Sequence, residues 1–221
     1  MIVGAGEGLG QEFGRLAAAD GGHLFLVGPN EDALLARATW LRQQGALTTR
    51  RMRAPLDQPG CARSIYEEWL MHQLLGEARY PLDTLINVTS FTPWQEDPWE
   101  ENGPDPRLHL GNLMELNQLF AREMQRQQKG SILNVLHRPM DLDASLEGMF
   151  EATKGLLLDF AYQLNQQLSS QPVHIITLVA SEHSFVLQAD HLPAHVAPDL
   201  APPTCSASDL ADYGYQVARA S

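Results

Sequence analysis

Short apolar runs alternate with longer segments of helical periodicity along most of this chain. A run of about four to eight apolar residues between turn residues is typical of a buried strand, whereas apolar residues about three or four apart mark one face of a helix. The expected strands are, in chain order, residues 1–3, 24–27, 48–53, 84–87, 131–136 and 173–179. This alternation predicts βαβ units, and therefore an α/β fold with a doubly wound parallel sheet. With 221 residues, the chain is expected to form a single domain over residues 1–221.

Helical periodicity fills the segments between these strands. The expected helices are residues 10–20, 31–44, 63–75, 108–128 and 146–168, with a helical fragment at most after residue 207. Asn30 precedes the second helix as an N-cap, and Glu31 and Asp32 follow in the first turn, where the helix dipole favours acidic groups. The last two helices have apolar stripes wide enough to cover the sheet and part of a partner subunit. The alternative is that both stripes are buried entirely within the chain.

Two segments interrupt the alternation. Residues 92–107 are rich in Pro, Trp and acidic side chains, and residues 182–206 are rich in Pro and His. We expect both to be loops or lids, because clusters of proline and polar residues end helices and strands. Insertions at the carboxyl ends of parallel strands contribute to ligand sites in open α/β sheets, but surface decoration is an equally good explanation. The acidic stretch 95–101 is expected to be a solvated surface.

Charge and hydropathy argue against several classes of partner. The formal net charge is -12, and the basic cluster Arg50-Arg51-Met52-Arg53 is too short to bind nucleic acid or an anionic lipid surface. No run approaches the roughly 20 apolar residues that a membrane-spanning helix needs. The amino terminus has no signal-peptide or transit-peptide pattern. We therefore expect a cytoplasmic protein without nucleic-acid or membrane partners.

Residue types that hold metals are scattered along the chain. Cys61 and Cys205 are far apart and have no C-x-x-C spacing, which argues against a disulfide framework or a zinc site. His183, His191 and His195 lie in the late loop and lack the fixed spacing of metal ligands on a helix. The sequence therefore predicts no metal site.

Closely spaced glycines separate the first strand from the first helix. Gly4, Gly8 and Gly10 have the spacing G-x-x-x-G-x-G. Glycines at such a turn let the backbone bend sharply, let a pyrophosphate approach without a Cβ in the way, and leave helix N–H groups facing the anion. We therefore predict a dinucleotide-phosphate site at Gly4, Gly8, Leu9 and Gly10. The alternative is a tight turn without a ligand.

The glycine spacing and two later motifs resemble the short-chain dehydrogenase/reductase family, over residues 2–181. Residues 85–90, L-I-N-V-T-S, are similar to the family's L-V-N-N-A-G, with Asn87 at the first asparagine. Residues 130–135, G-S-I-L-N-V, are similar to the family's G-x-I-V-N-I. The resemblance implies a Rossmann-type fold.

Cofactor, substrate and assembly are also implied by this resemblance. It implies NAD or NADP as cofactor, bound by the glycine turn, Asn87 and Lys154, and a small carbonyl or alcohol ligand. It further implies a homodimer or homotetramer formed through the helices at 108–128 and 146–168.

The family's catalytic positions can be carried over one by one. Asn112 matches the helix asparagine that holds a water of the proton relay, and Lys154 matches the lysine of the motif Y-x-x-x-K. In the family, the tyrosine hydroxyl exchanges a proton as hydride moves to or from nicotinamide, while the lysine lowers the tyrosine pKa and binds the ribose. Here Phe150 replaces the tyrosine, and His137 stands 13 residues earlier in place of the family's serine. Phenylalanine has no proton to give, so the chemistry changes.

Positions that would contact the two ends of the cofactor also differ. After the second strand, the family has Asp for a ribose hydroxyl or Arg for the adenosine phosphate of NADP, whereas this chain has Gly28 and Pro29. Ala54 stands near the family's adenine-contacting Asp, and residues 179–181, V-A-S, replace its Pro-Gly pair. Because the ribose-side charge is missing from these positions, we expect weak dinucleotide binding, with a Kd above about 100 µM.

Three hypotheses follow. The first is a dinucleotide-binding or regulatory protein with a degenerate active site, a pseudoenzyme of this family. The second is an atypical NAD(P)-dependent oxidoreductase acting on a carbonyl or alcohol, with His137 as proton donor because imidazole titrates near neutral pH. The third is a protein that shares only the architecture and binds no dinucleotide.

Overall fold

The structure is a computed structural model that describes residues 1–6, 8–76, 79–90, 106–138, 142, 144–168, 170, 172–181, 184–188 and 206–220. Within these ranges the strands form one sheet in the order β3-β2-β1-β4-β5-β6-β7. They are β1 (Ile2–Val3), β2 (His23–Gly28), β3 (Thr48–Arg53), β4 (Thr84–Ser90), β5 (Gly130–Arg138), β6 (Val173–Ser181) and β7 (Ser184–Gln188). β1 to β6 are parallel to one another, which confirms the predicted doubly wound parallel sheet.

The seventh strand departs from the predicted arrangement. β7 runs antiparallel to β6, with Thr177 opposite Gln188 and Ser181 opposite Ser184. The expectation of a loop throughout residues 182–206 is therefore wrong for 184–188. An antiparallel strand can follow its neighbour after a tight turn, whereas a further parallel strand would need a crossover. The late-loop histidines lie outside the described residues.

The helices lie between the strands as predicted. They are α1 (Gly8–Ala19), α2 (Glu31–Gln43), α3 (Cys61–Leu75), α4 (Pro106–Gln127), α5 (Ala144–Leu168) and α6 (Ala207–Ala220). The predicted N-cap is confirmed, because Asn30 Oδ1 accepts a hydrogen bond of 3.1 Å from the backbone N–H of Ala33. α4 includes residues 106–107, the end of the first expected loop, since proline is well suited to the first helical turn. The rest of that loop lies outside the described residues.

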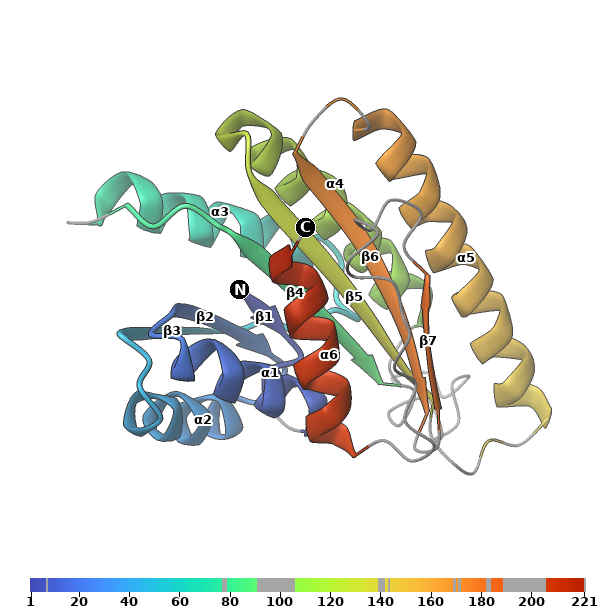
Figure 1. Cartoon of the computed structure of the whole chain (residues 1–221), viewed down its shortest axis with the longest axis horizontal. Coiled ribbons are helices and arrows are strands. Elements are labelled where there is room, and N and C mark those ends of the chain that lie inside the picture. Colours follow the sequence, from blue (N-terminus) through green and yellow to red (C-terminus); the bar gives the residue numbers. More distant parts are fainter. Residues whose placement is uncertain are drawn as a thin grey trace.

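Helices cover both faces of the sheet, and strand residues alternate between the two faces. One core joins α1, α2 and α6 to the sheet, and its strand residues include Ile2, Leu26, Ile86, Leu133, Val135 and Leu178. The other core joins α3, α4 and α5 to the opposite face, and its strand residues include Val3, Val27, Leu85, Ile132, Val173 and Ile175. Figure 1 shows α6 lying across the sheet on the side of α1. Burial on both faces explains why the strands are almost continuously apolar.

The last helix is longer and more important to the fold than the sequence indicates. α6 contributes Leu210, Ala211, Val217 and Ala218 to the core that it shares with α1. The Oγ of Ser131, on β5, donates a hydrogen bond of 2.5 Å to the carbonyl of Ala218. The expectation of a helical fragment at most is therefore wrong, because these apolar residues find partners on the sheet.

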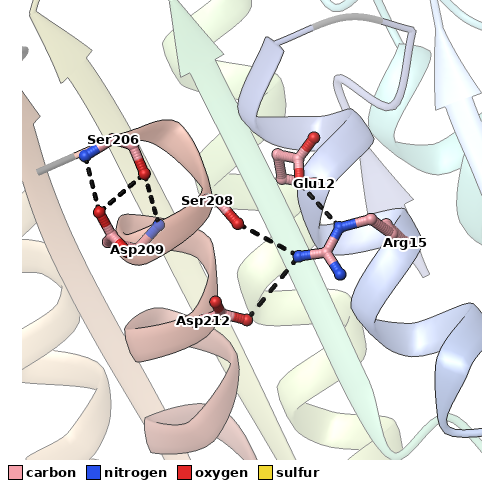
Figure 2. A network of polar contacts seen from close by, with 6 residues as sticks. All are labelled: Glu12, Arg15, Ser206, Ser208, Asp209 and Asp212. Carbon is pink, nitrogen blue, oxygen red and sulfur yellow. Dashed lines mark hydrogen bonds and ion pairs between the residues drawn. The ribbon is translucent and has the colours of Figure 1, made fainter.

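Polar contacts hold the start of α6 beside α1 (Figure 2). Ser206 Oγ accepts from the backbone N–H of Asp209 at 3.2 Å, and Asp209 Oδ2 accepts from the backbone N–H of Ser206 at 3.0 Å, which is a capping box. Ser206 holds the pKa of the Asp209 carboxyl below its usual value through these hydrogen bonds. Arg15 of α1 donates to Ser208 Oγ at 3.2 Å and lies 3.9 Å from Asp212.

The described residues contain neither a membrane-spanning helix nor a metal-binding cluster. Among their helices, none combines the length and apolar character that crossing a bilayer requires. Their His, Cys, Asp and Glu side chains form no group of three or more that could hold a metal ion.

Candidate functional site

The carboxyl ends of the central strands meet next to the glycine turn. Ser90 at the end of β4 is the register partner of His137 on β5, and His137 is the partner of Ala180 on β6. β1 lies on the other side of β4, with Val3 opposite Asn87, and leads directly into the glycines. We call this region the carboxyl edge; open α/β sheets bind their ligands there.

The glycines of the turn fall into two kinds, two packed tightly against backbone and one facing open space. Gly4 and Gly8 have φ values of +78° and +54°, which side chains other than glycine rarely adopt. A Cβ at Gly4 would lie 2.5 Å from the Val88 carbonyl oxygen, and one at Gly10 would lie 2.0 Å from the Gly4 carbonyl oxygen. Both glycines therefore pack directly against neighbouring backbone. Gly8 faces open space at the start of α1, with nothing within 4 Å of a Cβ position. Gly8 thus provides the open approach, and the other two provide the close strand–helix packing.

Two arginines outside the predicted site bond to backbone near the end of β2. Arg53, the last residue of β3, donates from Nε to the Pro29 carbonyl oxygen at 3.0 Å. Arg37 of α2 donates to the Gly6 carbonyl oxygen at 3.4 Å. The basic cluster at 50–53 was a signal for Arg53, but nothing in the linear sequence indicates that either side chain returns to this turn.

Phe150 is enclosed in an apolar cluster. Its side chain is 1% exposed on α5. The residues that share this cluster are Leu113 of α4, Leu136 of β5, and Leu146 and Leu157 of α5. A ring in this environment adds neither a proton donor nor a polar group to the carboxyl edge.

Lys154 and His137, both part of the predicted site, have different surroundings. Lys154, one turn after Phe150, pairs with Glu151 of the same helix, and about a third of its side chain is exposed. His137 is half-buried at the end of β5. The neighbouring Arg138 pairs with Glu147 of α5 at 2.6 Å, which ties the end of β5 to that helix.

Asn112 bonds to the loop between β3 and α3 and to the first turn of α3. Its Oδ1 accepts from the backbone N–H of Ala62 at 3.0 Å, and its Nδ2 donates to the carbonyl oxygens of Leu56 and Gln58 at 2.6 and 2.8 Å. The amide therefore uses both of its N–H groups on backbone. This arrangement gives Asn112 a structural task at a position where the family resemblance implied a water.

His109 lies one turn before Asn112 on α4 and was also absent from the predicted site. Desolvation lowers its pKa to about 4, although Asp57 acts in the opposite direction. Its Nε2 atom is buried, while the residue as a whole is partly exposed. In the sequence, the only sign that pointed to this residue is its spacing, three residues before Asn112.

Asn87 lies in the interior of the sheet. Its Nδ2 donates to Asn134 Oδ1 at 3.0 Å, and Asn134 exchanges hydrogen bonds of 3.0 Å with Asn117 of α4. These amides link β4, β5 and α4. Whether Asn87 also reaches a cofactor stays a prediction.

Comparison with known families agrees with this architecture. A family model described as short chain dehydrogenase matches residues 1–182. The chain belongs to the short-chain dehydrogenase family.

Individual members of the family are distant from this chain. The 7beta-hydroxysteroid dehydrogenase of Collinsella aerofaciens is 26% identical over 160 residues, which are 72% of this chain and 58% of that protein. The human 17-beta-hydroxysteroid dehydrogenase type 3 is 24% identical over 183 residues, 80% of this chain and 56% of that protein. The chain thus spans a little more than half the length of these curated relatives.

A solved structure supports the fold. A metagenomic short-chain oxidoreductase in complex with NADP has a TM-score of 0.66 at 17% identity and covers 98% of this chain and 89% of its own. At this identity the likeness establishes the Rossmann-type fold alone.

Proposed function

We propose that this chain binds a nicotinamide dinucleotide but does not carry out the tyrosine-dependent proton transfer of its family. The observation that carries this proposal is Phe150, which stands at the position of the tyrosine and is enclosed by leucines of three elements. A phenyl ring can neither donate nor accept a proton, and its burial leaves no open space for another group to act from that position. The chain is then a dinucleotide-binding or regulatory member of the family.

The glycine turn supports retained binding. Gly8 leaves an open approach at the start of α1, a helix of 12 residues, where N–H groups and the helix dipole favour an anion. A nicotinamide dinucleotide bound there would supply or accept hydride, and this chain's residues would hold its phosphates and exclude water. The structurally similar oxidoreductase in complex with NADP is consistent with that cofactor class.

Two further positions support the loss of the family's chemistry. The Lys154 charge is paired with Glu151 rather than with a phenol, and the Asn112 amide is bonded to Leu56 of the loop before α3 and to Ala62 in the first turn of α3. Both side chains therefore have structural partners that explain their retention without a proton relay. We propose that Asn112 positions this loop.

A second candidate function rests on His137. Its position at the carboxyl edge, between Ser90 and Ala180 in the sheet register, is where an imidazole could give a proton to a carbonyl. In that case the chain would be an atypical oxidoreductase of a secondary alcohol or ketone. The names of both curated relatives indicate hydroxysteroids as the substrate class to test first.

Binding and turnover can be measured separately. We expect the purified chain to bind NADPH or NADH in calorimetry and to show no oxidation of either with a panel of ketones that includes steroids. Phe150→Tyr should stay inactive, because the added hydroxyl would enter an apolar cluster at a cost of about 1–3 kcal/mol.

Turnover in the wild type would contradict the proposal. If His137→Ala then abolished turnover while His23→Ala did not, the second candidate would replace the first. His23 is a suitable control because it begins β2 at the opposite end of the sheet and bonds to Thr48. If neither dinucleotide bound, the proposal itself would fail.

A further inference from the structure

Two backbone segments are attached to the end of β2. The glycine turn is one of them, since the Gly4 N–H donates to the Val27 carbonyl oxygen at 2.9 Å. The other is the segment between β3 and α3, residues 54–60, which we call the β3–α3 loop. The Ala54 N–H donates to the Gly28 carbonyl oxygen at 2.9 Å. The loop therefore leaves the sheet one residue of β2 away from the bond that holds the glycine turn.

A dinucleotide bound at the glycine turn would extend toward this loop. In open α/β sheets the pyrophosphate lies at the turn and at the start of the helix that follows, and the adenosine ribose lies farther along the same edge of the sheet. The β3–α3 loop begins at that edge. Ala54 and Leu56 are 5% and 7% exposed, so the loop packs on the sheet rather than projecting into solvent. The path of its backbone therefore shapes the surface that an adenosine would meet.

Asn112 fixes this path from α4. Its Nδ2 donates to the carbonyl oxygens of Leu56 and Gln58. Its Oδ1 accepts from the N–H of Ala62, in the first turn of α3. One amide, 5% exposed, thus joins the middle of the loop to the helix that follows it. Because an unpaired backbone group in the interior is costly, removing this amide favours a different path for the loop.

A second buried asparagine makes bonds of the same kind at another place. Asn165 of α5 donates to the Ile175 carbonyl oxygen at 2.6 Å and accepts from the Ile175 N–H at 2.8 Å. Its side chain belongs to a residue that is 8% exposed. Ile175 is near the start of β6, which runs from Val173 to Ser181, so this contact lies away from the carboxyl edge. Asn165 matches Asn112 in burial and bonding but not in position.

We infer that Asn112 is a positioning residue for dinucleotide binding, because it holds the β3–α3 loop beside the adenosine half of the ligand. This inference rests on the proposed dinucleotide binding and deepens it. It gives Asn112 a role in affinity, exerted through the loop, where the family resemblance implied a water of the proton relay.

Calorimetry with NADPH, NADH and 5′-ADP compares the wild type with Asn112→Ala and Asn165→Ala. Both substitutions should lower the melting temperature, because each leaves buried backbone groups unpaired. Only Asn112→Ala should weaken binding, by about tenfold for each ligand that the wild type binds. An effect that includes 5′-ADP, which has no nicotinamide, belongs to the adenosine half. Asn112→Ser is the second variant, for use if Asn112→Ala does not fold.

Hydrogen exchange tests where the ligand lies. The tightest of the three ligands should slow the exchange of backbone amides in the β3–α3 loop of the wild type, because a bound ligand suppresses local opening. At equal saturation, this protection should be smaller in the folded Asn112 variant.

Three results would overturn the inference and leave dinucleotide binding intact. They are unchanged affinity in the folded Asn112 variant, an equal loss of affinity in Asn165→Ala, and a bound ligand that gives the loop no protection. A wild type that binds none of the three ligands would overturn the proposed function as well.

Discussion

Burial determines the chemistry of single residues near the carboxyl edge. Cys61, at the start of α3, is a free thiol whose pKa rises to about 11 because burial disfavours the thiolate, so it is a poor nucleophile. His109 responds to burial in the opposite direction, since burial disfavours the imidazolium and lowers its pKa to about 4. Both groups therefore stay neutral near pH 7.

The neutral state of His109 predicts acid sensitivity. In the unfolded chain a histidine binds its proton near about pH 6.5, but the folded chain does not bind it until about pH 4, so the free energy of unfolding falls as the pH drops between these values. Because the residue is partly exposed, we expect His109 to account for a loss of about 1–2 kcal/mol. In the variant His109→Gln, the free energy of unfolding should fall less on acidification, by this amount.

Urea unfolding of both proteins at about pH 7 and about pH 4.5 measures the difference. Carboxylates titrate equally in the two proteins, so they cancel in the comparison. Identical pH dependence of wild type and His109→Gln would show that folding does not lower the pKa of His109.

At the scale of elements, α6 illustrates how a helix is fixed by close packing. Tyr215 donates to Asp20 at 3.1 Å, and Arg219 pairs with the same carboxylate at the end of α1. Burial, followed by the Asp20 charge, raises the pKa of Tyr215 to about 12. Gly214, one residue before Tyr215, faces the sheet.

Gly214 allows α6 to approach the sheet. A Cβ at this position would lie 3.2 Å from side-chain carbons of Leu133 and Leu178 and 3.3 Å from Phe13. Gly214→Ala should therefore destabilise the fold by about 1–3 kcal/mol through overpacking. Gly155→Ala on α5 is the control, because its Cβ would meet nothing within 4 Å and alanine favours a helix by about 1 kcal/mol.

Thermal or urea unfolding of the two variants gives the comparison. If Gly214→Ala were as stable as Gly155→Ala, α6 would not be packed against β5 and β6 as described.

At the scale of the whole molecule, α4 and α5 lie on the outside of one face of the sheet. α5 exposes Leu156 at 44% and Tyr162 at 43%, although its other face is buried on the sheet. Exposed apolar residues on a long helix are suited to a subunit contact. The homodimer or homotetramer predicted from the sequence therefore stays a prediction, and this surface is where we expect the contact.

Leu156→Glu should shift the protein toward the monomer, because a buried unpaired carboxylate disfavours the contact. Sedimentation velocity of the wild type and the variant over a range of concentrations measures the shift. Leu75→Glu provides the control, since Leu75 is 76% exposed at the end of α3. A monomeric wild type, or an equal effect of both substitutions, would contradict an assembly through α5.

The parallel sheet and its helices could be predicted because their signals are carried by consecutive residues. Apolar runs, helical spacing and the Asn30 cap depend on neighbours in the chain, and so do the glycine turn and the Phe150 substitution. β7 and α6 were missed for the same reason. Their stability comes from partners elsewhere, as in the bond between Ser131 and Ala218, which are 87 residues apart.

The sequence by itself determined the order of the elements, the fold class, the position of the glycine turn and the absence of the family's tyrosine. Only the tertiary structure decided what surrounds each of these features. It bonds Asn112 to a loop 56 residues away at Leu56, and it places Arg53 beside Pro29, 24 residues earlier. The physical reason is that local conformation follows from nearby residues, whereas charge and burial at a site depend on how separate elements pack.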